Sequence, residues 1–76
     1  MYRLYYIYYM YNIRYSNHAR QRIVERGISE KEVSDAIKSG IKRIQDGKIV
    51  ASYTYFEIVY KKVHDKYYAI TVMLRW

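Results

Sequence analysis

Residues 16–33, with the sequence SNHARQRIVERGISEKEV, constrain the fold most, because they contain the end of one helix and the start of another. Gly27 supplies the left-handed backbone position at which helices often end. Ser29 and Glu32 have the Ser-x-x-Glu spacing of a capping box, in which each residue satisfies a free amide at a helix start. The sequence therefore predicts two short helices, one before Gly27 and one after Ser29.

The rest of the chain has the pattern of strands. From residue 41 the apolar side chains recur with a period of two, and Asp46-Gly47 is a strong signal for a hairpin turn. We expect strands over residues 41–45, 48–53, 55–63 and 67–74, the last with one face under the helices: Tyr68, Ile70, Val72 and Leu74. The predicted fold class is α+β, with two N-terminal helices packed on a three- to four-stranded antiparallel sheet, preceded by a short tyrosine-rich strand.

The first 15 residues contain seven of the twelve tyrosines. Aromatic enrichment without a helical period predicts an extended strand. Such rings can stack on nucleobases, but stacking platforms usually space their aromatic residues. We therefore favour an edge strand that forms a homodimer or binds an antitoxin-like partner. We expect residues 1–10 to be an extension or edge strand and residues 11–76 a single α+β domain, with Met1 or Met10 as the true start.

The charge balance favours an anionic partner. Fourteen Lys and Arg residues stand against seven acidic residues, giving a formal charge of +7, which indicates RNA, another nucleic acid or an acidic protein. The chain has no Cys, which excludes thiolate metal sites and fits a cytoplasmic location. We expect no metal and no cofactor. The longest apolar-looking run is too short to cross a bilayer, so no membrane partner is expected.

The first predicted helix gathers one His and three Arg residues: His18, Arg20, Arg22 and Arg26. At about 100° per residue, His18, Arg22 and Arg26 lie on one stripe. Arg20 falls inside the apolar arc, where a guanidinium needs a partner or an anion. Basic residues at the helix start also oppose the helix dipole. The free amides and cations of this helix start are therefore expected to bind a phosphate or a carboxylate.

Metal-independent cleavage of a phosphodiester is the chemistry that such a site suits. His18 is the candidate general acid or base, while Arg22 and Arg26 would hold the phosphate. Further candidates for nucleic-acid binding are Arg20, Tyr60, Lys61, Lys62 and Arg75. The alternative is structural: His18 bonds to backbone, Arg20 pairs with an acid such as Glu25 or Glu57, and the other cations are solvated.

The run His-Ala-x-x-Arg-x-x-x-Arg-Gly-Ile-Ser at residues 18–29, with the Asp46-Gly47 hairpin and the late strand YYAITVML, resembles a family named domain of unknown function 4258. That family is similar to small ribonuclease toxins of the RelE and BrnT type. The resemblance covers residues 12–74 and implies a RelE-like fold, action on RNA and restraint by an antitoxin. Its motif maps onto His18, Arg22 and Arg26.

Two hypotheses for the function follow. The first is a metal-independent endoribonuclease of toxin–antitoxin type. The alternative is a non-catalytic module that binds nucleic acid, or that regulates or binds another protein.

Overall fold

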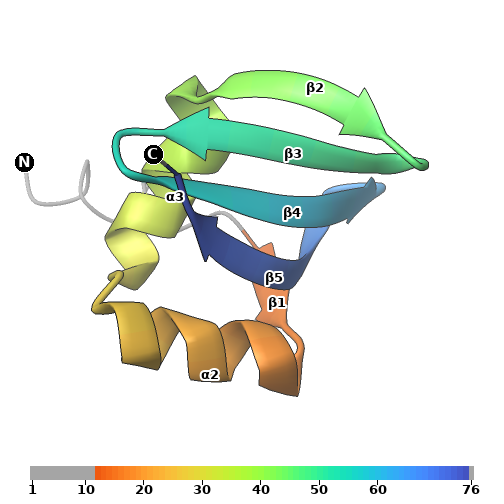
Figure 1. Ribbon diagram of the computed structural model, residues 1–76. Coiled ribbons are helices and arrows are strands. Elements are labelled where there is room, and N and C mark those ends of the chain that lie inside the picture. Colours follow the sequence, from red (N-terminus) through yellow and green to blue (C-terminus); the bar gives the residue numbers. More distant parts are fainter. Residues whose placement is uncertain (1–11, 76) are drawn as a thin grey trace, which may run out of the picture.

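The computed structural model describes residues 12–75, so the tyrosine-rich segment at residues 1–10 and the dimer contact expected there lie outside the described residues. Two helices and five strands follow one another in this part of the chain. They are β1 (Asn12–Tyr15), α2 (Asn17–Arg26), α3 (Glu30–Ser39), β2 (Ile41–Gln45), β3 (Lys48–Tyr53), β4 (Phe56–Val63) and β5 (Lys66–Leu74), as shown in Figure 1.

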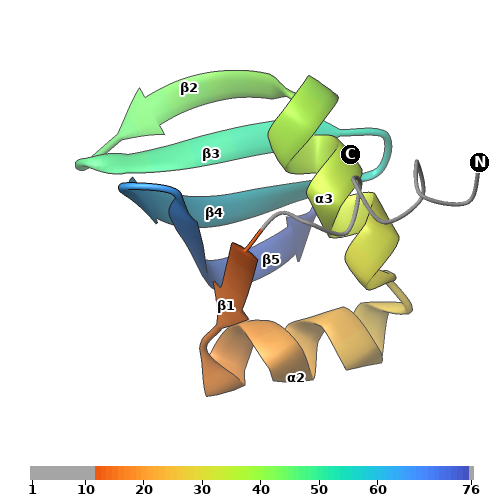
Figure 2. The same ribbon diagram turned by 180° about the vertical axis from the view of Figure 1, so that it is seen from behind.

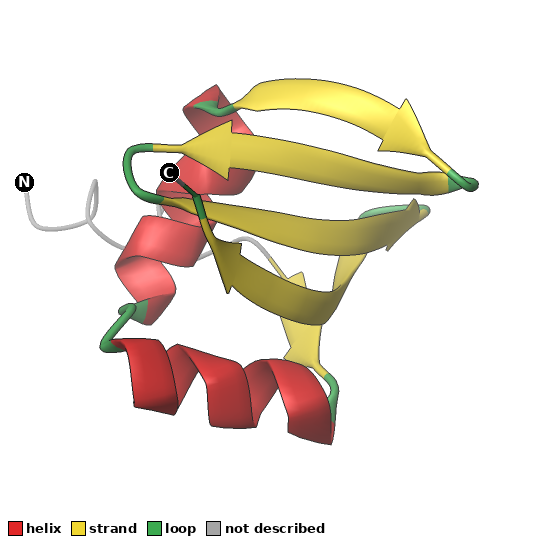
Figure 3. Cartoon of the chain, in the orientation of Figure 1, coloured by secondary structure: helices red, strands yellow, loops and turns green. Residues whose placement is uncertain are grey.

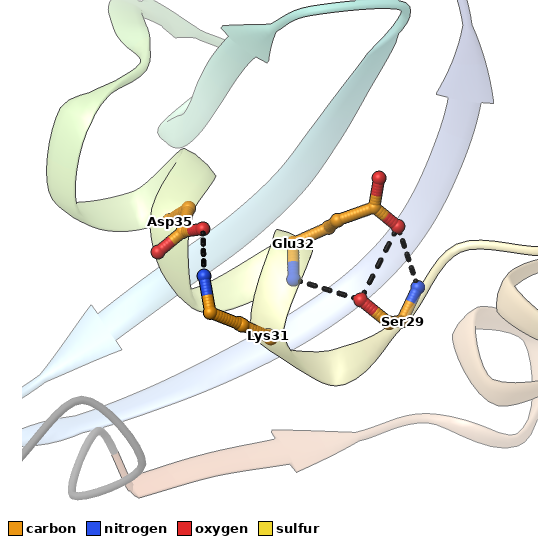
Figure 4. A network of polar contacts seen from close by, with 4 residues as sticks. All are labelled: Ser29, Lys31, Glu32 and Asp35. Carbon is orange, nitrogen blue, oxygen red and sulfur yellow. Dashed lines mark hydrogen bonds and ion pairs between the residues drawn. The ribbon is translucent and has the colours of Figure 1, made fainter. Parts of the chain in front are cut away.

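Both helices are bounded by the signals that the sequence contains. Gly27 ends α2 in the left-handed conformation, with φ 68°. At the start of α3 the Ser29 amide donates to the Glu32 carboxylate at 2.8 Å, and the Glu32 amide donates to the Ser29 hydroxyl at 3.1 Å (Figure 4). Lys31 and Asp35 form an ion pair at 3.1 Å on the next turn. The capping box predicted from the sequence is therefore present.

The sheet has the strand order β1-β5-β4-β3-β2. Strands β2 to β5 are antiparallel neighbours joined by turns of two residues, which leave no room for a crossover (Figure 3). The connection from β1 to β2 therefore carries both helices. Helix α3 passes behind β3 and β4 in Figure 1 and in front of them in Figure 2. We call the helix side of the sheet the covered face and the other side the open face.

The predicted fold class is wrong in the sheet and in the placement of the helices. The sheet has five strands and is mixed, because β1 runs parallel to β5. The helices follow this first strand instead of standing at the start of the domain. Parallel strands are joined by long crossovers and not by hairpins, so no local turn signal reports that β1 and β5 are partners.

The core lies between the helices and the covered face. Its buried side chains come from α2, α3, the segment between them and the three central strands. They are Ala19, Ile23, Ile28, Val33, Ala36, Ile37, Ala51, Phe56, Ile58, Tyr60, Ala69 and Val72. Because strand residues alternate between faces, the neighbours of these strand residues must lie on the open face.

A bulge in β5 interrupts this alternation. The pairing of β4 with β5 shifts after Val59 and Thr71, which leaves Ile70 as an extra residue. An extra residue of this kind moves the following side chains by one step relative to the partner strand. Ala69 and Val72 are consequently both buried on the covered face, although they are three residues apart.

The bulge also decides the face of Tyr68. The expectation that Tyr68 shares a face with Val72 and Leu74 is wrong. Tyr68 lies before the bulge, pairs with Arg14 on β1 and Lys61 on β4, and is 39% exposed on the open face. The apolar residues of this strand alternate as they would in a regular strand, so the sequence pattern did not predict the bulge.

Ser16 fastens the start of α2 to the bulge. Its hydroxyl accepts from the Ala19 amide at 3.0 Å and donates to the Ile70 carbonyl at 2.9 Å. Its own amide donates to the Ala69 carbonyl at 3.1 Å. One residue therefore caps the helix and holds it against β5.

Ser16→Ala removes both hydrogen bonds of the hydroxyl. We expect it to lower the free energy of unfolding by about 1–2 kcal/mol, because a helix cap and a carbonyl partner are lost together. Urea denaturation followed by circular dichroism measures the change. Ser39→Ala, at an exposed position in the last turn of α3, is the control, with an expected change below about 0.5 kcal/mol. Equal losses in the two variants would contradict this role of Ser16.

Candidate nucleic-acid interface

The stripe of His18, Arg22 and Arg26 does not converge on one point. These residues lie on α2 as predicted, but His18 is in its first turn and Arg26 is its last residue. Eight residues of helix separate them by about 12 Å along the axis. Side chains this far apart can contact successive groups of an extended ligand, but they do not surround a single phosphate.

The start of α2 presents an exposed imidazole and, two residues later, a guanidinium that lies over an aromatic ring. The His18 side chain is exposed and has no hydrogen bond or ion pair with another described residue. The Arg20 guanidinium lies 5.6 Å from the centre of the Tyr15 ring, a cation–π distance. Burial raises the pKa of Tyr15 to about 12, so its hydroxyl stays neutral. Arg20 is exposed here and does not lie in the apolar arc.

The two remaining arginines of α2 have different surroundings. Arg22 forms an ion pair with Glu25 at 3.2 Å, one turn away on the same helix. Arg26 is partly buried, and its Nε has no hydrogen-bond partner among the described residues. Val24 is apolar but 75% exposed. The buried side of α2 is therefore narrow and consists of Ala19 and Ile23.

The candidates on the strands separate onto different sides of the sheet. Tyr60 is 2% exposed and packs in the core, where no nucleobase can reach its ring. Lys61 lies on the open face, whereas Lys62 lies on the covered side with its ammonium 5.7 Å from the Tyr67 ring centre. Arg75 donates to the Thr54 carbonyl at 3.1 Å, at the far end of β4 from Lys61.

The open face brings together cations from four strands of the sheet. Arg14 on β1, Tyr68 on β5 and Lys61 on β4 form one row across neighbouring strands. Other cations of this face flank the row on β3 and β5. The open-face cations without an ion pair to another described residue are Arg14, Lys48, Lys61 and Lys66. An exposed aromatic ring is thus set between positive charges.

One acidic residue lies among the strand positions of the open face, and it is neutralised. Glu57 is bonded to Arg43 at 3.3 and 3.4 Å and accepts from the Ser52 hydroxyl at 2.9 Å. The Arg43 guanidinium and then the Ser52 hydroxyl hold the pKa of the Glu57 carboxyl below its usual value. Because Glu57 is occupied in this way, it does not cancel the charge of the row.

The open face is hollowed beside the β2–β3 turn. The hollow has a volume of about 180 Å³. Its lining combines side chains of the turn and of three strands: Gln45, Asp46, Lys48, Val50, Val59 and Met73. Valine and methionine side chains form its apolar part, and an amide, a carboxylate and an ammonium form its polar part.

Sequence reasoning missed most of this surface. Arg14, Lys48, Lys66 and Tyr68 were not named as site residues, because the predicted first strand was not paired with β5 and Tyr68 was assigned to the wrong face. A signal was nevertheless present on β4. Once Tyr60 is recognised as a core residue, strand alternation places Lys61 on the opposite face.

Residues 12–75 contain no group of three or more His, Asp or Glu side chains positioned to hold a metal ion. Neither of the two helices has the length and apolar character that a membrane span needs.

A model of the family described as "Domain of unknown function (DUF4258)" matches residues 15–74. The chain belongs to the DUF4258 family. This match confirms the resemblance carried by the motif that begins at His18. The comparison with curated proteins gives no match.

The fold of this DUF4258 domain is similar to a solved toxin–antitoxin structure. A chain in the crystal structure of the complex RelBE2 from Mycobacterium tuberculosis superposes with a TM-score of 0.58 and 15% sequence identity. The match covers 86% of the present chain and 98% of the other. At this identity the likeness concerns the fold alone.

Proposed function

We propose that this DUF4258 domain binds RNA through the open face of its sheet, as the RNA-binding unit of a toxin–antitoxin type protein. The observation that carries the proposal is the row of Arg14, Tyr68 and Lys61, in which an exposed ring lies between two cations that form no ion pair with another described residue. Cations contact phosphates, and an aromatic ring on a sheet stacks on an unpaired base.

The geometry of the row supports a single strand as the ligand. Adjacent strands of a sheet lie about 4.8 Å apart, so Arg14 and Lys61 are about 10 Å apart across the sheet with Tyr68 between them. A flat surface of this kind suits a chain whose bases are splayed out. In a duplex the bases are stacked away from such a ring.

The same charge supports an acidic protein as an alternative occupant. The chain has a formal charge of +7, and the structure to which it is similar is that of a toxin–antitoxin complex. In this proposal an acidic antitoxin covers the open-face cations and competes with RNA for them.

Lys61 and Lys62 provide a matched test, because they are adjacent on β4 and lie on opposite faces. We expect Lys61→Gln to weaken the binding of a fluorescent single-stranded RNA. We also expect it to reduce the slope of log affinity against log salt by about 0.7, the value for one phosphate contact with a single strand. Lys62→Gln should leave the slope unchanged. Fluorescence anisotropy at several salt concentrations measures the affinity and the slope. An affinity that does not change with salt concentration, or equal effects of the two variants, would refute the proposal.

RNA cleavage at the start of α2 is the second candidate function. The observation that favours it is the exposed His18 imidazole in the first turn of α2, at the positive end of the helix, with no hydrogen bond or ion pair to another described residue. In this candidate His18 acts as general acid or base, and Arg22 and Arg26 bind phosphates further along the strand. The other histidine, His64, lies in the β4–β5 turn.

For this second candidate we expect purified protein to cleave RNA in the presence of a chelator, because the proposed chemistry needs no metal. His18→Ala should abolish cleavage and His64→Ala should preserve it. Gel analysis of end-labelled RNA gives the rates. If the wild-type protein leaves RNA intact, or if His18→Ala cleaves as fast as the wild type, His18 is not a catalytic residue.

A further inference from the structure

The hollow of the open face differs in charge and shape from the surface around it. Its apolar part is formed by Val50, Val59 and Met73. Its lining also includes Asp46 and Lys48, which carry opposite charges. The charges that line the hollow therefore nearly cancel, whereas the surface around it is basic. A phosphate is attracted more strongly to the neighbouring cations than to the hollow.

The size of the hollow suits one ring system. Pockets for drug-sized ligands have volumes of about 300–1,000 Å³, whereas this one has about 180 Å³. A flat ring can rest on branched and thioether side chains while its edge meets polar groups at the rim. A single nucleobase has this combination of an apolar face and a polar edge.

The rim groups select among the bases. An ionised carboxylate only accepts hydrogen bonds, and a lysine ammonium only donates them. Guanine has two adjacent donors, N1–H and the N2 amino group, and two adjacent acceptors, O6 and N7. Lysine pairs well with O6 and N7. Adenine, cytosine and uracil lack the pair of adjacent donors, so only guanine matches both Asp46 and Lys48.

We propose that the hollow binds one guanine of the RNA strand held on the open face, with Asp46 accepting from N1–H and N2 and Lys48 donating to O6 or N7. This inference rests on the proposed function. Lys61 follows Val59 by two residues on the same face of β4, so a phosphate at Lys61 lies next to a base in the hollow. The open face thereby combines unspecific phosphate contacts with one specific base contact.

The test compares three uridine oligonucleotides of equal length that carry guanosine, inosine or adenosine at one central position. We expect the wild-type protein to bind the guanosine oligonucleotide about five- to tenfold more tightly than the adenosine one, because one good base contact is lost with adenine. Inosine keeps N1–H but lacks the N2 amino group, so its affinity should lie between the two. Fluorescence anisotropy at one fixed salt concentration gives the three affinities.

Asp46→Asn is the informative variant. Asn-Gly favours the same hairpin turn as Asp-Gly, so the fold is expected to persist, and circular dichroism checks it. The amide replaces one acceptor by a donor, and the preference for guanosine should disappear. Asp65→Asn makes the same charge change in the β4–β5 turn and should keep the preference.

Two results separate the failure of this inference from the failure of RNA binding. If the wild-type protein binds all three oligonucleotides equally, or if Asp46→Asn keeps the preference, the guanine site is refuted while RNA binding stands. If none of the oligonucleotides binds even at low salt, the proposed function fails and the guanine site fails with it.

Discussion

The layout of this domain depends on one topological constraint, which is that a single connection is long enough to leave the plane of the sheet. The connections among β2, β3, β4 and β5 are two-residue turns, and only the link from β1 to β2 holds helices. Both helices therefore pack on the same side, where Ser16 fixes the first of them to the bulge of β5. No helix of residues 12–75 covers the opposite side, so the side chains there can contact a ligand.

The charge of the open face follows from the same alternation that forms the core. Each strand residue buried under the helices has neighbours that point away from them, so a buried Tyr60 places Lys61 outside. Like charges directly opposite on neighbouring strands repel one another. Here Tyr68 stands between Arg14 and Lys61 and keeps them about 10 Å apart, close to the screening length at physiological salt. Tyr68 thus separates the two cations of the row.

Local signals in the sequence predicted the local structure. The glycine at the end of α2, the capping box at Ser29 and the Asp46-Gly47 turn all appear as expected, because each depends on residues within a few positions of one another. The parallel pairing of β1 with β5 and the extra residue Ile70 depend on partners far apart in the chain. No neighbouring residue encodes them, so the sequence did not predict which residues share the open face. The stripe of His18, Arg22 and Arg26 was correctly predicted to lie on the first helix. The rise of the helix separates His18 from Arg26, so the three side chains do not surround one phosphate.

The most direct test of this account is to find where RNA contacts the protein. In a titration of isotope-labelled protein with a uridine-rich single-stranded RNA, followed by amide chemical shifts in NMR, we expect the largest changes at Arg14, Lys61 and Tyr68. The amide of His18 should stay nearly unchanged under the same conditions. Changes concentrated at His18 and Arg20, with the open face unaffected, would contradict the claim that the uncovered side of the sheet is the RNA-binding surface.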